Sequence, residues 1–244
     1  MLGHMASWVD GEVLGLDFET TGIDRFNDVP VSYALVRVVG GVVRTSWSGL
    51  IDPGREIPAE ATEVHGITTE RARGEGMPLP EAIGLVTDGV VSASRRGMPL
   101  AGMKLDYDLT ILDTQAKLLL GGGIVERGWR GPVLDAGVID RHFDPDREGR
   151  RTLVDLCGLY GVGIGRPHDA SVDAIASVEV LFALAARHDA LSQCELAQLH
   201  LDQTRWHREW AHVYDEWRIA QGMIPIDRRD YEWPVAPAAL PPAA

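Results

Sequence analysis

The order in which strands and helices are predicted limits this 244-residue chain to a small set of folds. A short apolar run at 13–17 precedes two Val-rich runs at 30–39 and 42–51, joined by Gly40-Gly41 as in a hairpin. Helical periodicity follows at 80–93, 109–120, 152–160 and 170–187, interrupted by short apolar runs at 99–102 and 132–136. Strands that come first and then alternate with helices predict an α/β fold, with a mixed five-stranded sheet covered by helices on both faces.

A long helix is predicted after this alternating region. Between Leu196 and Ala220, apolar and aromatic residues recur at spacings of three and four, and three of them are tryptophans. We expect this stripe to pack on the rest of the chain. The segment Pro234–Ala244 is rich in Pro and Ala, so we expect it to be disordered and to add nothing to a core.

These features divide the chain into four segments. Residues 1–7 are expected to be a tag or disordered, because Gly-His-Met-Ala-Ser resembles an expression-vector remnant. A folded α/β domain is expected at 8–187, a helical extension at 188–222 and an irregular, Pro-rich tail at 223–244.

Composition excludes several classes of protein. No apolar stretch approaches the roughly 18 residues of a membrane span, and the N-terminus lacks a secretory pattern. The two cysteines have no Cys-x-x-Cys spacing, which favours the reducing cytoplasm and argues against a zinc finger. A formal net charge of −13 disfavours a protein that coats nucleic acid. It still allows an enzyme that holds one nucleic-acid end through bound cations.

The first candidate site is the segment 17–22, Asp-Phe-Glu-Thr-Thr-Gly. At the end of a strand, period-two alternation places Asp17 and Glu19 on one side and Phe18 on the other. Two adjacent carboxylates repel each other unless a cation neutralises them, so the pair is a candidate for a hard metal. Taken alone, two solvated acids at a strand end are an equally ordinary interpretation.

Two further groups carry similar residues. Asp106 and Asp108 directly precede a predicted helix, where one of them could be only a helix cap. His168 precedes another predicted helix that contains Asp173, so both could face the strand end that carries Asp17. An imidazole can accept a proton from water near neutral pH, and a carboxylate beside it can complete a metal's oxygen ligands.

Together these groups resemble the three motifs of the DEDDh, or DnaQ-like, 3′–5′ exonuclease superfamily. The first motif corresponds to 17–22, the second to 107–112 (Tyr-Asp-Leu-Thr-Ile-Leu) and the third to His168-x-Ala170-x-x-Asp173. Residues 64–67, Val-His-Gly-Ile, match a further signature between the first two motifs. The resemblance covers about residues 13–186, is strongest to proofreading-type members, and favours Asp108 over Asp106.

The resemblance implies a ribonuclease-H-like fold and phosphodiester hydrolysis by a two-metal mechanism. Asp17, Glu19, Asp108 and Asp173 would bind two Mg²⁺ or Mn²⁺ ions, and His168 would be the general base. These five residues are the candidate catalytic set.

The resemblance also implies a set of residues that bind the terminal nucleotide: Thr20, Thr21, Gly22, His65, Lys104 and Tyr107. An alternative for His65 is that it only orders its own loop. The family's second motif usually carries His-Asn where this chain has Met103-Lys104. Lys104 is therefore expected to contact a phosphate, and whether the nucleotide is held in the usual way is in doubt.

The expected activity is that of a metal-dependent 3′–5′ exonuclease that releases nucleoside monophosphates from the 3′ end of single-stranded DNA. DNA is favoured over RNA because the motif set resembles proofreading-type members, and proofreading would act in trans with a DNA polymerase. The alternatives are a 3′–5′ exoribonuclease or oligoribonuclease, a phosphodiesterase of small nucleotides, and a non-catalytic docking protein on a nuclease scaffold.

Overall fold

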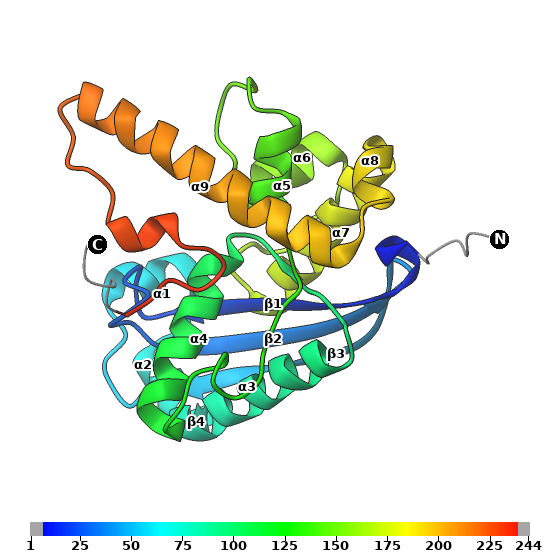
Figure 1. Ribbon diagram of the computed structural model, residues 1–244. Helices are drawn as coiled ribbons and strands as arrows, with labels where there is room; N and C mark the ends of the chain where they lie inside the picture. The colour runs from blue at the N-terminus through cyan, green and yellow to red at the C-terminus, as the bar shows by residue number, and fades with distance from the viewer. Residues whose placement is uncertain (1–6, 239–244) are drawn as a thin grey trace.

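The computed structural model describes residues 7–238 and shows one sheet with helices on both sides (Figure 1). The strands are β1 (Glu12–Thr20), β2 (Pro30–Val39), β3 (Val42–Asp52), β4 (Met77–Pro78), β5 (Leu100–Gly102) and β6 (Val133–Asp135). The α-helices are α1 (Ala59–His65), α2 (Thr69–Glu75), α3 (Leu79–Arg95), α4 (Leu105–Leu120), α5 (Ala136–Phe143), α6 (Leu153–Tyr160), α7 (Ala170–Arg187), α8 (Asp189–Ser192) and α9 (Leu196–Ala220). Short 3-10 helices span Trp8–Asp10 and Arg228–Tyr231.

The six strands lie in the order β4-β3-β2-β1-β5-β6. β1 and β2, and likewise β2 and β3, pair antiparallel, whereas β5 pairs in parallel with β1 and with β6. The α/β fold class with a mixed sheet is therefore confirmed. The expected five strands become six because the two-residue β4 adds to the far edge beside β3, and so short an element leaves no periodic signal in the sequence.

Two hydrophobic cores cover the two faces of the sheet. Leu16 and Phe18 of β1 pack with α3 and α4 on one face. Val13 packs with α7 and its neighbours on the other face, which Asp17 and Glu19 also share by strand alternation. A Cβ at Gly15 would lie 3.1 Å from Val178 Cγ2 and 3.3 Å from the Ala174 carbonyl oxygen. Glycine at this position thus lets α7 lie close to the carboxylates of β1.

Several helix boundaries differ from the sequence expectation. α4 begins at Leu105, not at Leu109, so Asp106 and Asp108 lie inside its first turn. α5 starts directly after β6, so the expected strand 132–136 ends one residue earlier, at Asp135. The short helices α1 and α2 carry few apolar residues and were not expected. Such helices depend on tertiary contacts more than on their own periodicity.

The helix α9 packs on the domain mainly through its first half. Gln203 is fully buried and pairs with the backbone of β6: its Oε1 accepts from Asp135 N and its Nε2 donates to the Val133 oxygen, both at 2.8 Å. In the second half, Val213 is 66% exposed and Trp217 is 48% exposed. The expectation that the whole tryptophan stripe packs on the domain is therefore wrong for this half, which extends beyond the sheet (Figure 1).

The segment after α9 returns to the domain and contributes to its core. Trp233 is 5% exposed and belongs to the core beneath α4, and Ala236 is also buried. The Ala236 backbone N–H donates to Thr110 Oγ1 at 3.0 Å. The expectation that Pro234 onward adds nothing to a core is therefore wrong as far as residue 238, because one tryptophan anchors the segment.

The expected tag at 1–7 lies outside the described residues apart from Ser7, as does the end of the tail at 239–244. No helix between residues 7 and 238 combines the length and the apolarity needed to cross a membrane.

Candidate active site

The C-terminal end of strand β1 carries the first two carboxylates. Glu19 is buried and Asp17 half-buried, and both project from the face of β1 that α7 covers. Burial raises the pKa of Asp17 well above its ordinary value, and repulsion from Asp108, Glu19 and Asp173 raises it further. Burial, followed by repulsion from Asp173 and Asp169, raises the pKa of Glu19 to about 7.

The helix α4 adds Asp108 and directs Asp106 elsewhere. Asp108 is 4% exposed and its Oδ1 accepts a hydrogen bond from the backbone N–H of Phe18, which lies between the two acids of β1 (3.0 Å). Burial is the main reason that the pKa of Asp108 is also raised. Asp106 forms an ion pair with Arg25, 2.9 Å from Oδ2 to the guanidinium nitrogen. The structure brings Asp108, and not Asp106, beside Asp17.

The start of α7 supplies the third group. Asp169 caps the helix by accepting from Ser171 N and Val172 N, and this fixes the turn that carries His168. His168 has the left-handed backbone angle φ 63°, is exposed, and donates its backbone N–H to Asp173 Oδ2 at 3.1 Å. Asp173 lies in the first turn of α7 and burial raises its pKa. An exposed imidazole beside these acids is free to reach a water molecule.

These side chains fit a divalent metal ion. One ligand atom from each of Glu19, His168 and Asp173 lies within 4.8 Å of the other two. Asp173 Oδ1 is buried and has no hydrogen-bond partner in the described chain. A buried carboxylate oxygen without a partner is costly, and a hard cation with oxygen ligands would satisfy it and offset the repulsion among the acids.

Three of the expected nucleotide-binding residues form one hydrogen-bonded group beside these acids. Thr20 Oγ1 donates to the Gly22 carbonyl oxygen (2.7 Å), the Tyr107 hydroxyl donates to the same oxygen, and the two hydroxyls lie 3.0 Å apart. Burial raises the pKa of Tyr107 to about 12, so it remains a neutral donor. Thr21 points away, with its hydroxyl donating to Asp28 Oδ1 at 2.7 Å. Its side chain orders the loop after β1.

His65 orders its own loop in the structure, and its contact with the terminal nucleotide stays a prediction. Its Nδ1 accepts from Ile67 N at 3.0 Å, which orders the turn after α1. Its Nε2 is buried without a partner among the described residues, and the ring lines a pocket shared with Glu19 and His168. Burial lowers the pKa of His65, so the neutral ring is favoured. Arg166 lines the same pocket; the sequence reasoning missed it, although it stands two residues before His168.

Comparisons with known proteins agree with this geometry. Residues 14–181 match the family model RNase_T, described as exonuclease. This chain belongs to that exonuclease family. The DnaQ-like 3′–5′ exonuclease superfamily inferred from the motifs is thereby confirmed, and with it the enzyme class, phosphodiester hydrolases that depend on divalent metal ions.

The relatives of this exonuclease domain include polymerase-associated proteins. The chain is 25% identical over 201 residues to the PolC-type DNA polymerase III of Thermotoga maritima, covering 81% of this chain and 14% of that protein. It is also 25% identical over 179 residues to the DNA polymerase III subunit epsilon of Aquifex aeolicus, covering 72% and 81% of the two chains. The chain therefore spans about a seventh of the Thermotoga protein.

A solved structure supports the fold of the exonuclease domain. Escherichia coli exonuclease I in complex with a dA16 oligonucleotide superimposes with a TM-score of 0.63 at 18% identity. The match covers 81% of this chain and 44% of that one. At this identity the likeness establishes a shared fold.

Lys104, which departs from the usual family motif, is the exposed residue before α4. Its backbone has φ 59° and ψ 42°, the left-handed region that a side chain with a Cβ adopts at a cost and that Asn tolerates better. It faces a different pocket from His65, on the α5 and α9 side of the site. The contact of Lys104 with a substrate phosphate thus stays a prediction, and the phosphate would have to lie in this neighbouring pocket.

The strained backbone at Lys104 predicts an effect on stability. Lys104→Asn should raise the free energy of unfolding by about 0.5–1 kcal/mol relative to Lys104→Ala, because Asn adopts the left-handed conformation more readily. Denaturant unfolding of the two variants measures this difference. Both remove the positive charge, so equal stabilities would contradict the backbone explanation.

Proposed function

We propose that this chain is a metal-dependent 3′–5′ exonuclease that shortens single-stranded DNA from its 3′ end and releases nucleoside monophosphates. The observation that carries the proposal is a group of Glu19, Asp173 and the exposed His168 whose ligand atoms lie within 4.8 Å of one another. Asp17 lies close enough to Asp108, Glu19 and Asp173 to be repelled by all three, and a buried oxygen of Asp173 has no partner among the described residues. Such a set has a clear use in phosphodiester hydrolysis and none in a simple scaffold.

Asp17, Glu19, Asp108 and Asp173 would hold two Mg²⁺ or Mn²⁺ ions. Bound divalent ions make water easier to deprotonate and offset the charge that develops on the phosphate. His168, exposed at the mouth of the site, would accept the proton of the attacking water. The hydrogen bond from the Phe18 backbone N–H to Asp108 Oδ1 would hold that carboxylate against β1 during the reaction.

The group formed by Thr20, Gly22 and Tyr107 would place the terminal nucleotide next to the acids. His65 would present its unpartnered Nε2 to the sugar or phosphate of that nucleotide. Thr21 would act indirectly, by ordering the loop after β1, and Lys104 would contact a phosphate in the neighbouring pocket. Single-stranded DNA is proposed as substrate because the relatives are DNA polymerase III proteins and an exonuclease I bound to a DNA oligonucleotide. A DNA polymerase chain acting in trans is the proposed partner.

The proposal is tested by incubating matched single-stranded DNA and RNA, labelled at the 5′ end, with the protein in Mn²⁺ or in EDTA. We expect a Mn²⁺-dependent ladder that shortens from the 3′ end, faster on DNA. The double variant Asp17→Asn/Glu19→Gln, prepared in parallel, should show no ladder and so excludes a contaminating nuclease.

Other outcomes select the alternatives. A faster ladder on RNA would replace the proposal by an exoribonuclease. Hydrolysis of small nucleotide esters without a ladder would indicate a small-nucleotide phosphodiesterase. The absence of all hydrolysis, together with no shift in melting temperature on adding Mn²⁺, would favour a non-catalytic docking protein.

A further inference from the structure

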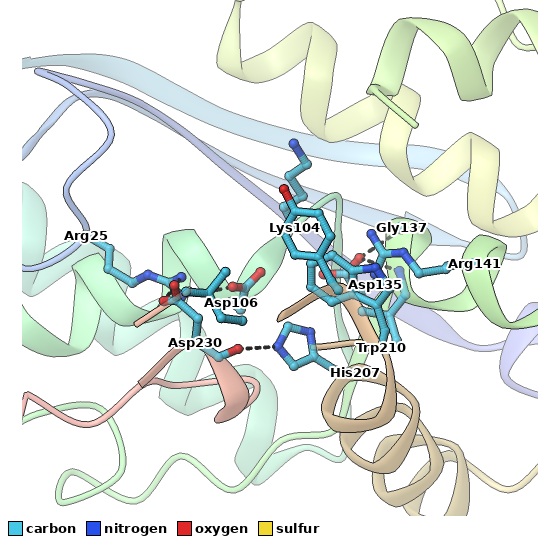
Figure 2. Close-up of a pocket in the computed structure, with 12 residues that line it drawn as sticks. Arg25, Lys104, Asp106, Asp135, Gly137, Arg141, His207, Trp210 and Asp230 are labelled. Carbon is cyan, nitrogen blue, oxygen red and sulfur yellow. Dashed lines mark hydrogen bonds and ion pairs between the residues drawn. The ribbon is translucent and has the colours of Figure 1, made fainter. Parts of the chain in front are cut away.

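A groove runs between α5 and α9 beside the candidate active site. It consists of two adjoining cavities that share Val138, Arg141 and Trp210. Tyr214 also lines the inner cavity. Lys104 lines the same cavity (Figure 2). The outer cavity, of about 580 Å³, is lined by Trp206 and by two arginines of the loop after α5. We call this the α5–α9 groove.

The groove adjoins the site because neighbouring strands end there. β1, β5 and β6 are parallel neighbours, so their carboxyl ends meet at one edge of the sheet. The acids Asp17 and Glu19 are on the last residues of β1, Lys104 lies two residues after β5, and Asp135 ends β6. Lys104 and Asp108 are one turn apart at the start of α4, so this turn separates the site from the groove.

Two cationic side chains that line the groove have no acid as a direct ion-pair partner among the described residues. Neither Lys104 nor Arg141 forms an ion pair within residues 7–238, and the Arg141 guanidinium lies 3.9 Å from the centre of the Trp210 ring. Desolvation lowers the pKa of Arg141, a cost that an anion in the groove would offset. The nearby acids have other partners: Asp106 and Asp230 share Arg25, and Asp135 accepts backbone N–H groups (Figure 2). In a chain with a net charge of −13, such a place is distinctive.

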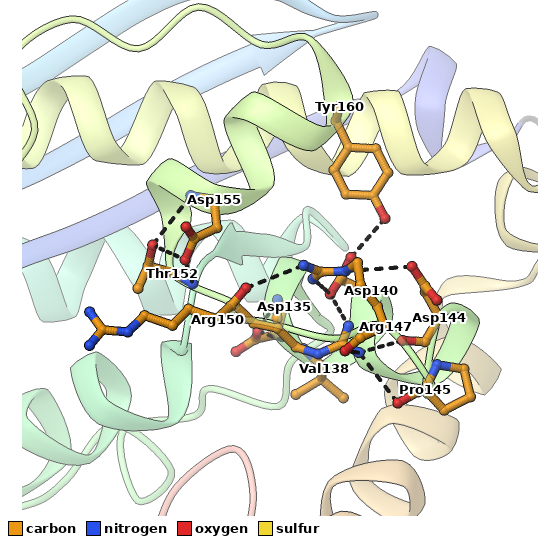
Figure 3. Close-up of polar contacts among 12 residues, drawn as sticks. Asp135, Val138, Asp140, Asp144, Pro145, Arg147, Arg150, Thr152, Asp155 and Tyr160 are labelled. Carbon is orange, nitrogen blue, oxygen red and sulfur yellow. Dashed lines mark hydrogen bonds and ion pairs between the residues drawn. The ribbon is translucent and has the colours of Figure 1, made fainter.

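The loop after α5 is held so that its arginines face the same groove. Asp140 is fully buried; its Oδ2 accepts from Arg147 (2.7 Å) and Arg151, and its Oδ1 accepts from the Tyr160 hydroxyl at 2.7 Å (Figure 3). Arg147 also faces Asp144 at 3.5 Å, so two carboxylates balance the two guanidinium groups, and both arginines line the outer cavity. Glu209, the acid on that wall, faces Arg205 at 3.9 Å.

Aromatic rings continue from the groove along α9. The rings of Trp210 and Tyr214 lie 12° from parallel with centroids 5.2 Å apart, and those of Tyr214 and Trp217 lie 14° from parallel at 5.8 Å. We call these three rings the aromatic ladder. Trp217 at its end is 48% exposed. An exposed ring beside arginines, such as that of Trp217, is a surface on which bases of single-stranded nucleic acid stack without sequence preference.

We propose that the α5–α9 groove and the aromatic ladder bind the 5′ part of the single strand whose 3′ end enters the active site. Phosphates would lie along Lys104, Arg141 and the two loop arginines, and bases would stack on the ladder. The inference rests on the proposed exonuclease function and extends it: long strands are bound more tightly than short ones.

The test compares a long single-stranded DNA with a dinucleotide that is too short to reach the aromatic ladder. Trp217→Ala and Arg141→Gln should each raise KM for the long strand by about tenfold and leave the dinucleotide unchanged, as expected for the loss of one stacking or phosphate contact. Each groove variant is also combined with Asp17→Asn, which prevents turnover. Fluorescence anisotropy of a labelled long strand should then show the same weakening of binding, as a higher Kd. Trp47→Ala is the matched control, because Trp47 is also 48% exposed but lies beside α3 across the sheet.

The possible results separate the two proposals. If the wild type degrades both substrates and neither groove variant changes KM or Kd for the long strand, the groove proposal is overturned and the exonuclease function stands. If a groove variant impairs the dinucleotide equally, or Trp47→Ala has the same effect, a specific role of the groove is likewise rejected. If the wild type shortens neither substrate, the proposed function itself fails.

Discussion

Asp17→Asn is expected to reduce exonuclease activity by about 10³-fold or more, because Asp17 lies among the other acids of the site. Catalytic groups that act as one unit lose most of their effect when any one of them is removed. The same variant should be more stable than the wild type when metal is absent. The carboxylate is desolvated and repelled by Asp108 and Glu19, and asparagine relieves both effects at nearly the same volume. The gain should be about 1–3 kcal/mol at pH 8, the usual cost of a buried polar group that lacks a partner.

The sign of the pH dependence follows from the raised pKa values. An acid whose pKa is higher in the folded state stabilises the fold fully below its unfolded pKa of about 4. It loses this stabilisation as the pH rises through its folded value, which is about 7 for Glu19. The metal-free wild type should therefore lose stability between pH 5 and 8 relative to Glu19→Gln, which lacks this titrating group. Urea unfolding in EDTA at both pH values measures this; a constant difference would contradict the charge cluster.

Asp108→Asn is expected to reduce activity by about 10²–10³-fold, whereas Asp106→Asn should change it by less than about threefold. Asp108 is buried against the Phe18 backbone beside Asp17, but Asp106 lies in an ion pair with Arg25 outside the carboxylate cluster. Asp106→Asn should instead lower the unfolding free energy by up to about 1 kcal/mol, because Arg25 also pairs with Asp230 in the segment after α9.

Steady-state hydrolysis of a labelled DNA strand, with the fold verified by circular dichroism, compares the two variants. The two positions lie two residues apart in the first turn of α4 and carry the same chemical change, so each variant is the control for the other. A severe loss in Asp106→Asn with a mild loss in Asp108→Asn would shift the second motif by two residues and remove Asp108 from the proposed metal ligands.

Much of the fold followed from local pattern. The Val-rich runs became β2 and β3, the Gly40-Gly41 turn joined them, and the periodic segments became α3, α4, α6, α7 and α9. Residues of short elements such as β4, α1 and α2 carry too little apolar repetition to be recognised. β4 and α2 form because β3 and α3 offer them neighbours, and those neighbours lie outside any local stretch of sequence.

The candidate active site likewise has a part that the sequence predicted and a part that it did not. Strand alternation sufficed to place Asp17 and Glu19 opposite Phe18, and the motifs named Asp108, His168 and Asp173 as their companions. The sequence could not tell that Thr21 turns to Asp28 or that Lys104 faces a separate groove. Those outcomes depend on loops whose direction is fixed by contacts with distant residues.

The sequence by itself determined the chemistry of this protein: which acids and which histidine are present, in what order, and on which side of each strand or helix they stand. That information is local, since periodicity and motif spacing extend over a few residues. Only the tertiary structure decided which halves of amphipathic elements are covered. Trp233 is buried in the core, whereas Trp217 remains exposed on the aromatic ladder. Burial depends on which surfaces pack together, and residues far apart in the chain determine that packing.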